Sequence, residues 1–129
     1  MAQVKIYGLK SALAETREGL SKAIHESLME AFALPEDKRF HRFIGLEKED
    51  FLYPSDRSEN YTIIELSLFE GRSVEAKKQL INRLFSKAKA YAGIEAQDLE
   101  ITLFETPKCN WGIRGMPGDE LALNYKVNV

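Results

Sequence analysis

The sequence predicts an α+β fold in which the order β-α-β occurs twice and two helices cover one face of a four-stranded sheet. Short runs of alternating apolar residues indicate strands, and two longer segments with apolar residues every three to four positions indicate helices. The second half repeats the element order of the first. We therefore expect a single domain over residues 1–129, made of two β-α-β units at about 1–57 and 58–129, each joining parallel strands by a crossover.

The first unit begins with a short strand over residues 4–7. The helix that follows is expected to be capped by Ser11. Pro35 ends this helix, because the residue before a proline is biased away from the helical conformation. A second strand over residues 39–46 and a turn-rich loop over 47–60 complete the unit.

The second unit contains a strong strand over residues 61–69, a helix between a Ser73 cap and a Gly93 stop, and a strand over 99–105. Beyond them, residues 121–129 alternate between apolar and polar in the pattern of a half-buried strand. A terminal strand frays unless it is held, so we expect it to pair with a neighbouring subunit. This strand and the sheet face that no helix covers together predict a homotrimer.

Composition excludes several classes of protein. The 18 basic and 20 acidic residues are mixed along the chain and give a net charge of -2, which disfavours nucleic acid as a partner. Lys5 and Lys10 interrupt any signal-peptide run, and no segment approaches the ~20 apolar residues that span a bilayer. The single cysteine, Cys109, fits a reducing compartment, so we expect a cytoplasmic protein. Two histidines and one cysteine without ligand spacing predict no metal site, and we expect no cofactor.

Four segments together resemble the tautomerase superfamily, and malonate semialdehyde decarboxylase is a member to which they align: "AQVKIYGL", "RFHRF", "FEGRSVEAKKQLINRLF" and "DLEITLFETPKCNWGIRGMPGDEL". The resemblance implies trimers of β-α-β repeat chains. It also implies that the initiator methionine is removed to expose a proline whose amine transfers a proton. Arginines that bind a substrate carboxylate and aromatics that close the pocket are implied as well.

The resemblance places the catalytic proline on Ala2, whose amine would be the catalytic group once the initiator methionine is removed. It places the acidic residue of the decarboxylase on Lys38 and its two arginines on Glu70 and Arg72. Trp111 matches the pocket tryptophan. Because the proline and the acid are both replaced, decarboxylase activity is not expected.

Arg72 follows a strand and precedes a helix N-terminus, where a guanidinium suits a carboxylate. The alternative is a solvated arginine after a turn. Arg39 and His41 share one face of a strand and are expected to form a basic anion pocket, or else an exposed strand face with a structural histidine. His25 is expected on the surface of its helix.

Trp111 and Arg114 lie in the glycine-rich stretch "CNWGIRGMPGDEL", which lacks the lysine and Ser/Thr of a phosphate loop. Trp111 is either a pocket wall or a packing residue of the core or of a subunit contact, and Arg114 is a further candidate for substrate binding.

Three functions remain open. The first is a weak tautomerase for a small 2-oxo or enol carboxylate, with Ala2 moving the proton and Arg72, with Arg39 or His41, holding the carboxylate. The second is a non-catalytic trimer that binds a small anion or a protein, and the third is a purely structural trimer.

Overall fold

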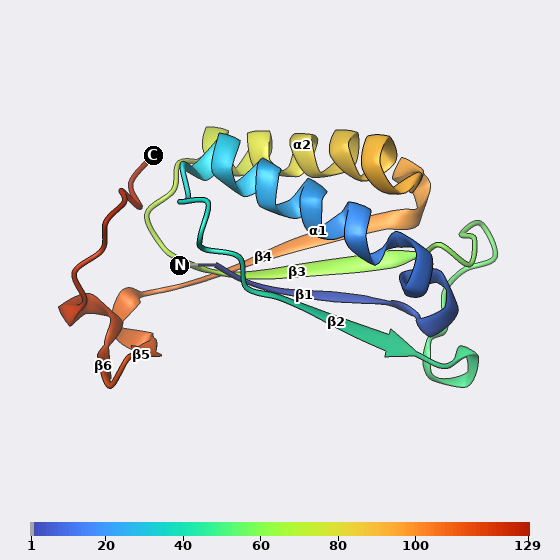
Figure 1. Cartoon of the computed structure of the whole chain (residues 1–129), viewed down its shortest axis with the longest axis horizontal. Coiled ribbons are helices and arrows are strands. Elements are labelled where there is room, and N and C mark those ends of the chain that lie inside the picture. The colour runs from blue at the N-terminus through green and yellow to red at the C-terminus, as the bar shows by residue number, and fades with distance from the viewer. Residues whose placement is uncertain (1) are drawn as a thin grey trace.

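The computed structural model describes residues 2–129 and contains a four-stranded sheet with two long helices on one face (Figure 1). The element order confirms the predicted repeat of β-α-β. The main elements are β1 (Ala2–Leu9), α1 (Lys10–Phe32), β2 (His41–Leu46), β3 (Thr62–Phe69), α2 (Val74–Ala92) and β4 (Leu99–Thr106).

The strand order is β2-β1-β3-β4, so the two units meet at the centre of the sheet. β1 pairs with β2 and β3 pairs with β4 in parallel, as predicted, whereas β1 and β3 are antiparallel. In this register Ala2 lies opposite Leu68, and Val4 lies opposite both Leu66 and His41. The starts of β1 and β2 therefore lie at the same end of the sheet as the last residues of β3 and β4.

The core lies between the sheet and the helices. Alternate residues of the central strands, such as Ile6, Ile64 and Leu66, point to the helices and are 0% exposed. The opposite face of the sheet is uncovered in the single chain. It carries half-exposed polar residues together with Phe104, which keeps 48% of its surface exposed.

The helix ends agree with the sequence at α2 but not at the start of α1. Ser73 accepts a backbone N–H of the first turn of α2, and Gly93 ends this helix at φ 68°, as predicted. By contrast, α1 starts directly after Leu9, which has no side chain to cap it, and Ser11 lies inside the first turn. The predicted Ser11 cap is therefore wrong, because β1 runs into α1 without a loop.

The segment after β4 contains a small hairpin that the sequence analysis did not predict. Strands β5 (Gly112–Ile113) and β6 (Met116–Pro117) are joined by Arg114 and Gly115, with φ of 50° and 84°. Two successive positive φ values are typical of the tight turns in two-residue hairpins.

Residues 121–129 form no strand within the single chain and run back past the end of β3 and the start of α2 (Figure 1). The alternation of apolar and polar residues in this segment accompanies a contact with β3 instead, since Val127 is buried against Phe69. The pairing of this segment with a second subunit stays a prediction.

Candidate functional site

The start of β1 and the end of β3 lie side by side at one end of the sheet. Ala2 is 4% exposed and pairs with Leu68. β3 ends at Phe69, and Arg72 follows three residues later, immediately before the Ser73 cap of α2. The adjacency of β1 and β3 thus places the first residue of the described chain and Arg72 at the same end of the sheet.

Arg72 is 5% exposed and is therefore not the solvated arginine of the alternative interpretation. Its Nη1 donates to the Phe69 carbonyl oxygen at 3.1 Å. Its guanidinium carbon lies 4.7 Å from the centroid of the Phe32 ring, at the end of α1. Nε and Nη2 of Arg72 are buried and have no hydrogen-bond partner among the described residues.

Two buried N–H groups without acceptors destabilise a protein by roughly 1–3 kcal/mol each. A carboxylate satisfies such a pair in the planar, bidentate geometry that guanidinium favours. Burial lowers the pKa of Arg72, and the nearby Tyr125 and Glu105 partly oppose this shift. An arginine nevertheless stays protonated in proteins, so the site retains a positive charge.

Trp111 builds the aromatic side of this site. Its Nε1 donates to Thr106 Oγ1 at 2.7 Å. Its ring meets Phe69 edge-on, with 5.0 Å between the ring centroids. Because the Phe69 carbonyl also holds Arg72, Trp111 packs against the residue that positions the guanidinium. Its role as a pocket wall stays a prediction.

Arg114 is exposed at the turn of the small hairpin. It lines a cavity of about 240 Å³ with Lys38 and Tyr125. Burial raises the pKa of Tyr125, while the positive charges of Arg72 and Arg114 oppose the shift. Tyr125 therefore lies within electrostatic reach of both arginines.

Arg39 and His41 meet on Ser21 of α1, away from Arg72. His41 Nδ1 lies 2.8 Å from Ser21 Oγ, and Arg39 Nη1 donates to the same oxygen at 3.4 Å. The two side chains thus reach the same side of the sheet, but β2 begins at His41, so the predicted strand over 39–46 starts two residues too early and Arg39 precedes it. β1 separates β2 from β3. Burial, together with the charges of Arg39 and His25, lowers the pKa of His41 to about 4, so its imidazole is neutral at pH 7.

His25 is 3% exposed, so the predicted surface position is wrong. Its ring centroid lies 6.4 Å from that of His41, and neither of its ring nitrogens has a hydrogen-bond partner among residues 2–129. β2 packs along the flank of α1 and covers this side of the helix. Helical periodicity alone identified only the face of α1 that meets the sheet.

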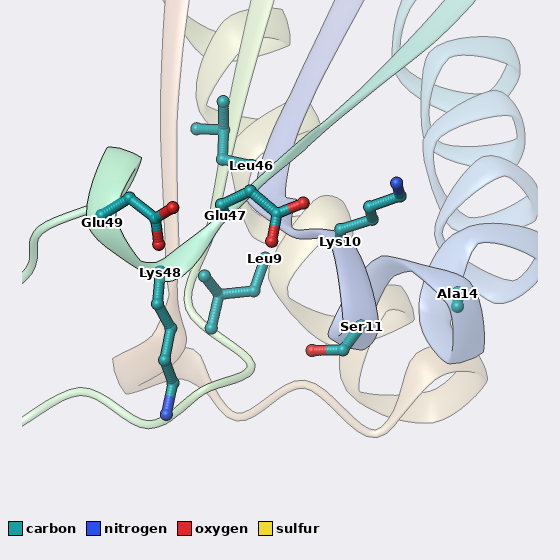
Figure 2. A pocket seen from close by; sticks show the side chains of 8 residues that line it. All are labelled: Leu9, Lys10, Ser11, Ala14, Leu46, Glu47, Lys48 and Glu49. Carbon is teal, nitrogen blue, oxygen red and sulfur yellow. The ribbon is translucent and has the colours of Figure 1, made fainter.

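A cavity of about 510 Å³ lies at the opposite end of the sheet, where α1 begins and β2 ends (Figure 2). Glu47 and Glu49 line it, and the Lys48 ammonium points away to Glu59 at 3.0 Å. Lys10 lines the same cavity, so side chains of both charges face it and an anionic ligand has no clear advantage there.

Phe32 and Thr106 are parts of the Arg72 site that sequence reasoning missed. Phe32 is the last residue of α1. Its place at the end of an apolar helix face was the signal in the sequence that could have found it. Within residues 2–129, no cluster of three or more metal-binding side chains occurs and no helix is long and apolar enough to cross a membrane.

The chain is similar in sequence to known tautomerases. A sequence model of the family described as "Tautomerase enzyme" matches residues 38–114, more than half of the chain. The probable tautomerase YusQ of Bacillus subtilis is 29% identical over 97 residues, which cover 71% of this chain and 76% of that protein. The 2-hydroxymuconate tautomerase of Comamonas testosteroni is 32% identical over 57 residues, covering 44% of this chain and 90% of that enzyme.

Solved structures share the fold. Malonate semialdehyde decarboxylase superposes with a TM-score of 0.79 at 18% identity, covering 88% of this chain and 92% of that one. A symmetric trimer of fused 4-OT gives a TM-score of 0.77 at 19% identity, covering 91% of this chain and 96% of that one.

Proposed function

Because the chain belongs to the tautomerase enzyme family, we propose that it is a weak keto–enol tautomerase that acts on a small 2-oxo acid or its enol carboxylate. The observation that carries this proposal is the buried Arg72, whose Nε and Nη2 have no hydrogen-bond partner among the described residues. These groups suit a substrate carboxylate at the end of the sheet where β1 begins.

In the proposed reaction Arg72 holds the carboxylate while the enol oxygen loses its proton and the C=C bond is replaced by a C=O bond. The alkene carbon that does not carry the oxygen gains a proton. Substrate and product have the same atoms, so one group that first accepts a proton and then donates it is enough for the reaction. With Met1 removed, the α-amine of Ala2 is the proposed base, since an α-amine has a pKa of ~7.7–8.0 and titrates near neutrality. The pairing of Ala2 with Leu68 directs this amine to the end of the sheet where Arg72 lies.

The activity is expected to be at least about 100-fold below that of relatives with an N-terminal proline, because a misplaced base forfeits much of the ~10²–10⁴-fold that acid–base catalysis contributes. A proline ring fixes the backbone around its nitrogen, whereas the primary amine of alanine rotates. The same change favours the second candidate function, a non-catalytic trimer that binds small anions.

The working form is proposed to be a cytoplasmic homotrimer. The uncovered sheet face with the exposed Phe104 needs a cover, and fused 4-OT, which shares the fold, is a trimer. The single exposed Cys109 fits a reducing compartment.

Ketonisation of phenylenolpyruvate by tag-free protein, with Met1 removal verified by intact mass, tests the proposal. Arg72→Ala should lower kcat/KM roughly tenfold or more, because a charge-assisted hydrogen bond contributes ~1.5–3 kcal/mol. The control Arg17→Ala removes an exposed arginine of α1 and should leave the rate unchanged. Equal rates for Arg72→Ala and wild type would overturn the proposal, and saturable binding of phenylpyruvate without turnover would establish the non-catalytic alternative.

A further inference from the structure

Residues 121–129, here called the strap, contact the chain on both sides of Arg72. The Ser73 N–H donates to the Val129 carbonyl oxygen at 2.9 Å. On the other side, a Cβ added to Gly71 would clash with the side-chain oxygen of Asn128 and lie 3.1 Å from Val127 Cγ1. The strap therefore lies over the backbone that carries Arg72.

The strap is also seated on the aromatic side of the Arg72 site. Val127 is 4% exposed and packs in one cluster with Phe69 and Trp111. Tyr125 lies within electrostatic reach of the Arg72 guanidinium. Arg72 is thus enclosed by Phe32 and Phe69 from the core and by the strap from outside.

The strap is the part of this enclosure that moves most easily. Phe32 and Phe69 are each 0% exposed and belong to the core elements α1 and β3. In the described chain, a single backbone hydrogen bond, from Ser73 to Val129, ties residues 122–129 to the body. Segments with few backbone bonds to their surroundings open at low free energy.

We propose that the strap closes the Arg72 site and that a small carboxylate reaches the guanidinium only when the strap lifts. Strap and ligand then exclude each other, so the measured affinity equals the affinity of the open site multiplied by the open fraction. The inference rests on the proposed function of Arg72 and adds the regulation of that site by the chain's own C-terminal segment.

Benzoate titrated calorimetrically into three forms of the full chain tests this inference. Val127→Asn places a polar amide in the Phe69–Trp111 cluster and should lift the strap, so benzoate should bind at least about tenfold more tightly than to wild type. A chain ending at Glu120 should give the same gain, and Val127→Asn alone decides if the shortened chain does not fold. The matched control Asn124→Ala alters an exposed strap residue and should leave affinity unchanged.

Two further measurements separate the outcomes. A red shift of the Trp111 emission reports that the strap has lifted, and Arg72→Ala in the Val127→Asn chain should abolish the gain in affinity. Suppose that benzoate binds wild type and Val127→Asn equally well, in both cases through Arg72, although the strap has lifted in the variant. This result would overturn the closing role of the strap and leave the proposed function standing. No binding of benzoate to any form, with the Trp111 shift present, would overturn both.

Discussion

Arg72 differs from the other buried or half-buried arginines in what faces its guanidinium. Arg57 and Arg83 each meet a carboxylate, Glu100 at 2.8 Å and Glu30 at 2.7 Å. Arg72 meets a carbonyl oxygen and a phenyl ring instead. A buried charge without a counter-ion is destabilising, so an anionic ligand at this position would stabilise the chain.

Restoring the proline tests the role of the first residue. Ala2→Pro, with Met1 removed, should raise kcat/KM for phenylenolpyruvate by about 10²-fold if a correctly placed amine is what the chain lacks. Intact mass and steady-state kinetics on the same sample provide the measurement. Strong turnover by protein that retains Met1 would show that another side chain is the base.

His41 makes stability depend on pH. Its pKa falls from the ordinary 6.5 to about 4 on folding, so between these values the unfolded chain binds more protons than the folded chain. The contribution of neutral His41 to the unfolding free energy is therefore fully present above about pH 6.5 and is lost as the pH falls towards 4. Between pH 7 and 4.5 the wild type should lose about 2 kcal/mol of unfolding free energy more than His41→Gln, measured by urea titration.

A smaller pH effect should remain in Arg39→Gln, which removes one charge that disfavours protonated His41. Identical pH profiles for wild type and His41→Gln would contradict the burial of a neutral imidazole.

At single residues, the sequence predicted what local alternation determines. Arg39 and His41 do reach the same residue, Ser21, although only His41 lies on β2. Arg72 was identified by resemblance and by its position before a helix. The burial of His25 was not predictable, because it depends on how β2 lies along α1 rather than on any local pattern. The Ser21–His41 contact, twenty residues apart, has the same origin.

The two helices cross closely where α1 carries Gly19. A Cβ at this position would lie 2.8 Å from the Tyr91 carbonyl carbon of α2 and still closer to its oxygen. From sequence, Gly19 only weakens its helix, by ~1 kcal/mol relative to alanine. The structure shows that this loss permits the backbone contact between the helices.

Gly19→Ala should therefore destabilise the protein by about 1–3 kcal/mol, as overpacking does, in spite of the better helix propensity. The exposed position Ala14 provides the contrast, since Ala14→Gly should cost ~1 kcal/mol through propensity alone. Urea unfolding of both variants measures the difference. A stabilised Gly19→Ala would mean that the helices do not approach here.

Among whole elements, those with a strong internal pattern were predictable and those shaped by distant contacts were not. The Ser73 cap and the Gly93 stop are local signals, and both are confirmed. The strand pattern of residues 121–129 instead accompanies a segment that packs on Phe69. Alternation of apolar and polar residues predicts that one side of a segment is buried, but not whether the segment pairs as a strand.

The whole chain leaves one face of its sheet uncovered, which leads to the prediction of a trimer. Phe104→Lys places a charge on that face, at the edge strand β4. It should lower the mass measured by sedimentation from three chains towards one at micromolar concentration. Val74→Lys, a similar change at a 63% exposed position of α2, should keep the trimer. A stable wild-type monomer would leave the fold intact and remove the trimer.

Carboxylate binding at Arg72 can be followed at its own Nε–H by nuclear magnetic resonance of protein with ¹⁵N-labelled arginine. Its signal is assigned by its loss in Arg72→Lys. Because this N–H is buried without a partner in the described chain, we predict that addition of phenylpyruvate shifts the signal saturably. The exposed Arg17 signal should stay in place. A saturating ligand that leaves the Arg72 signal unmoved would contradict the assignment of this residue as the carboxylate site.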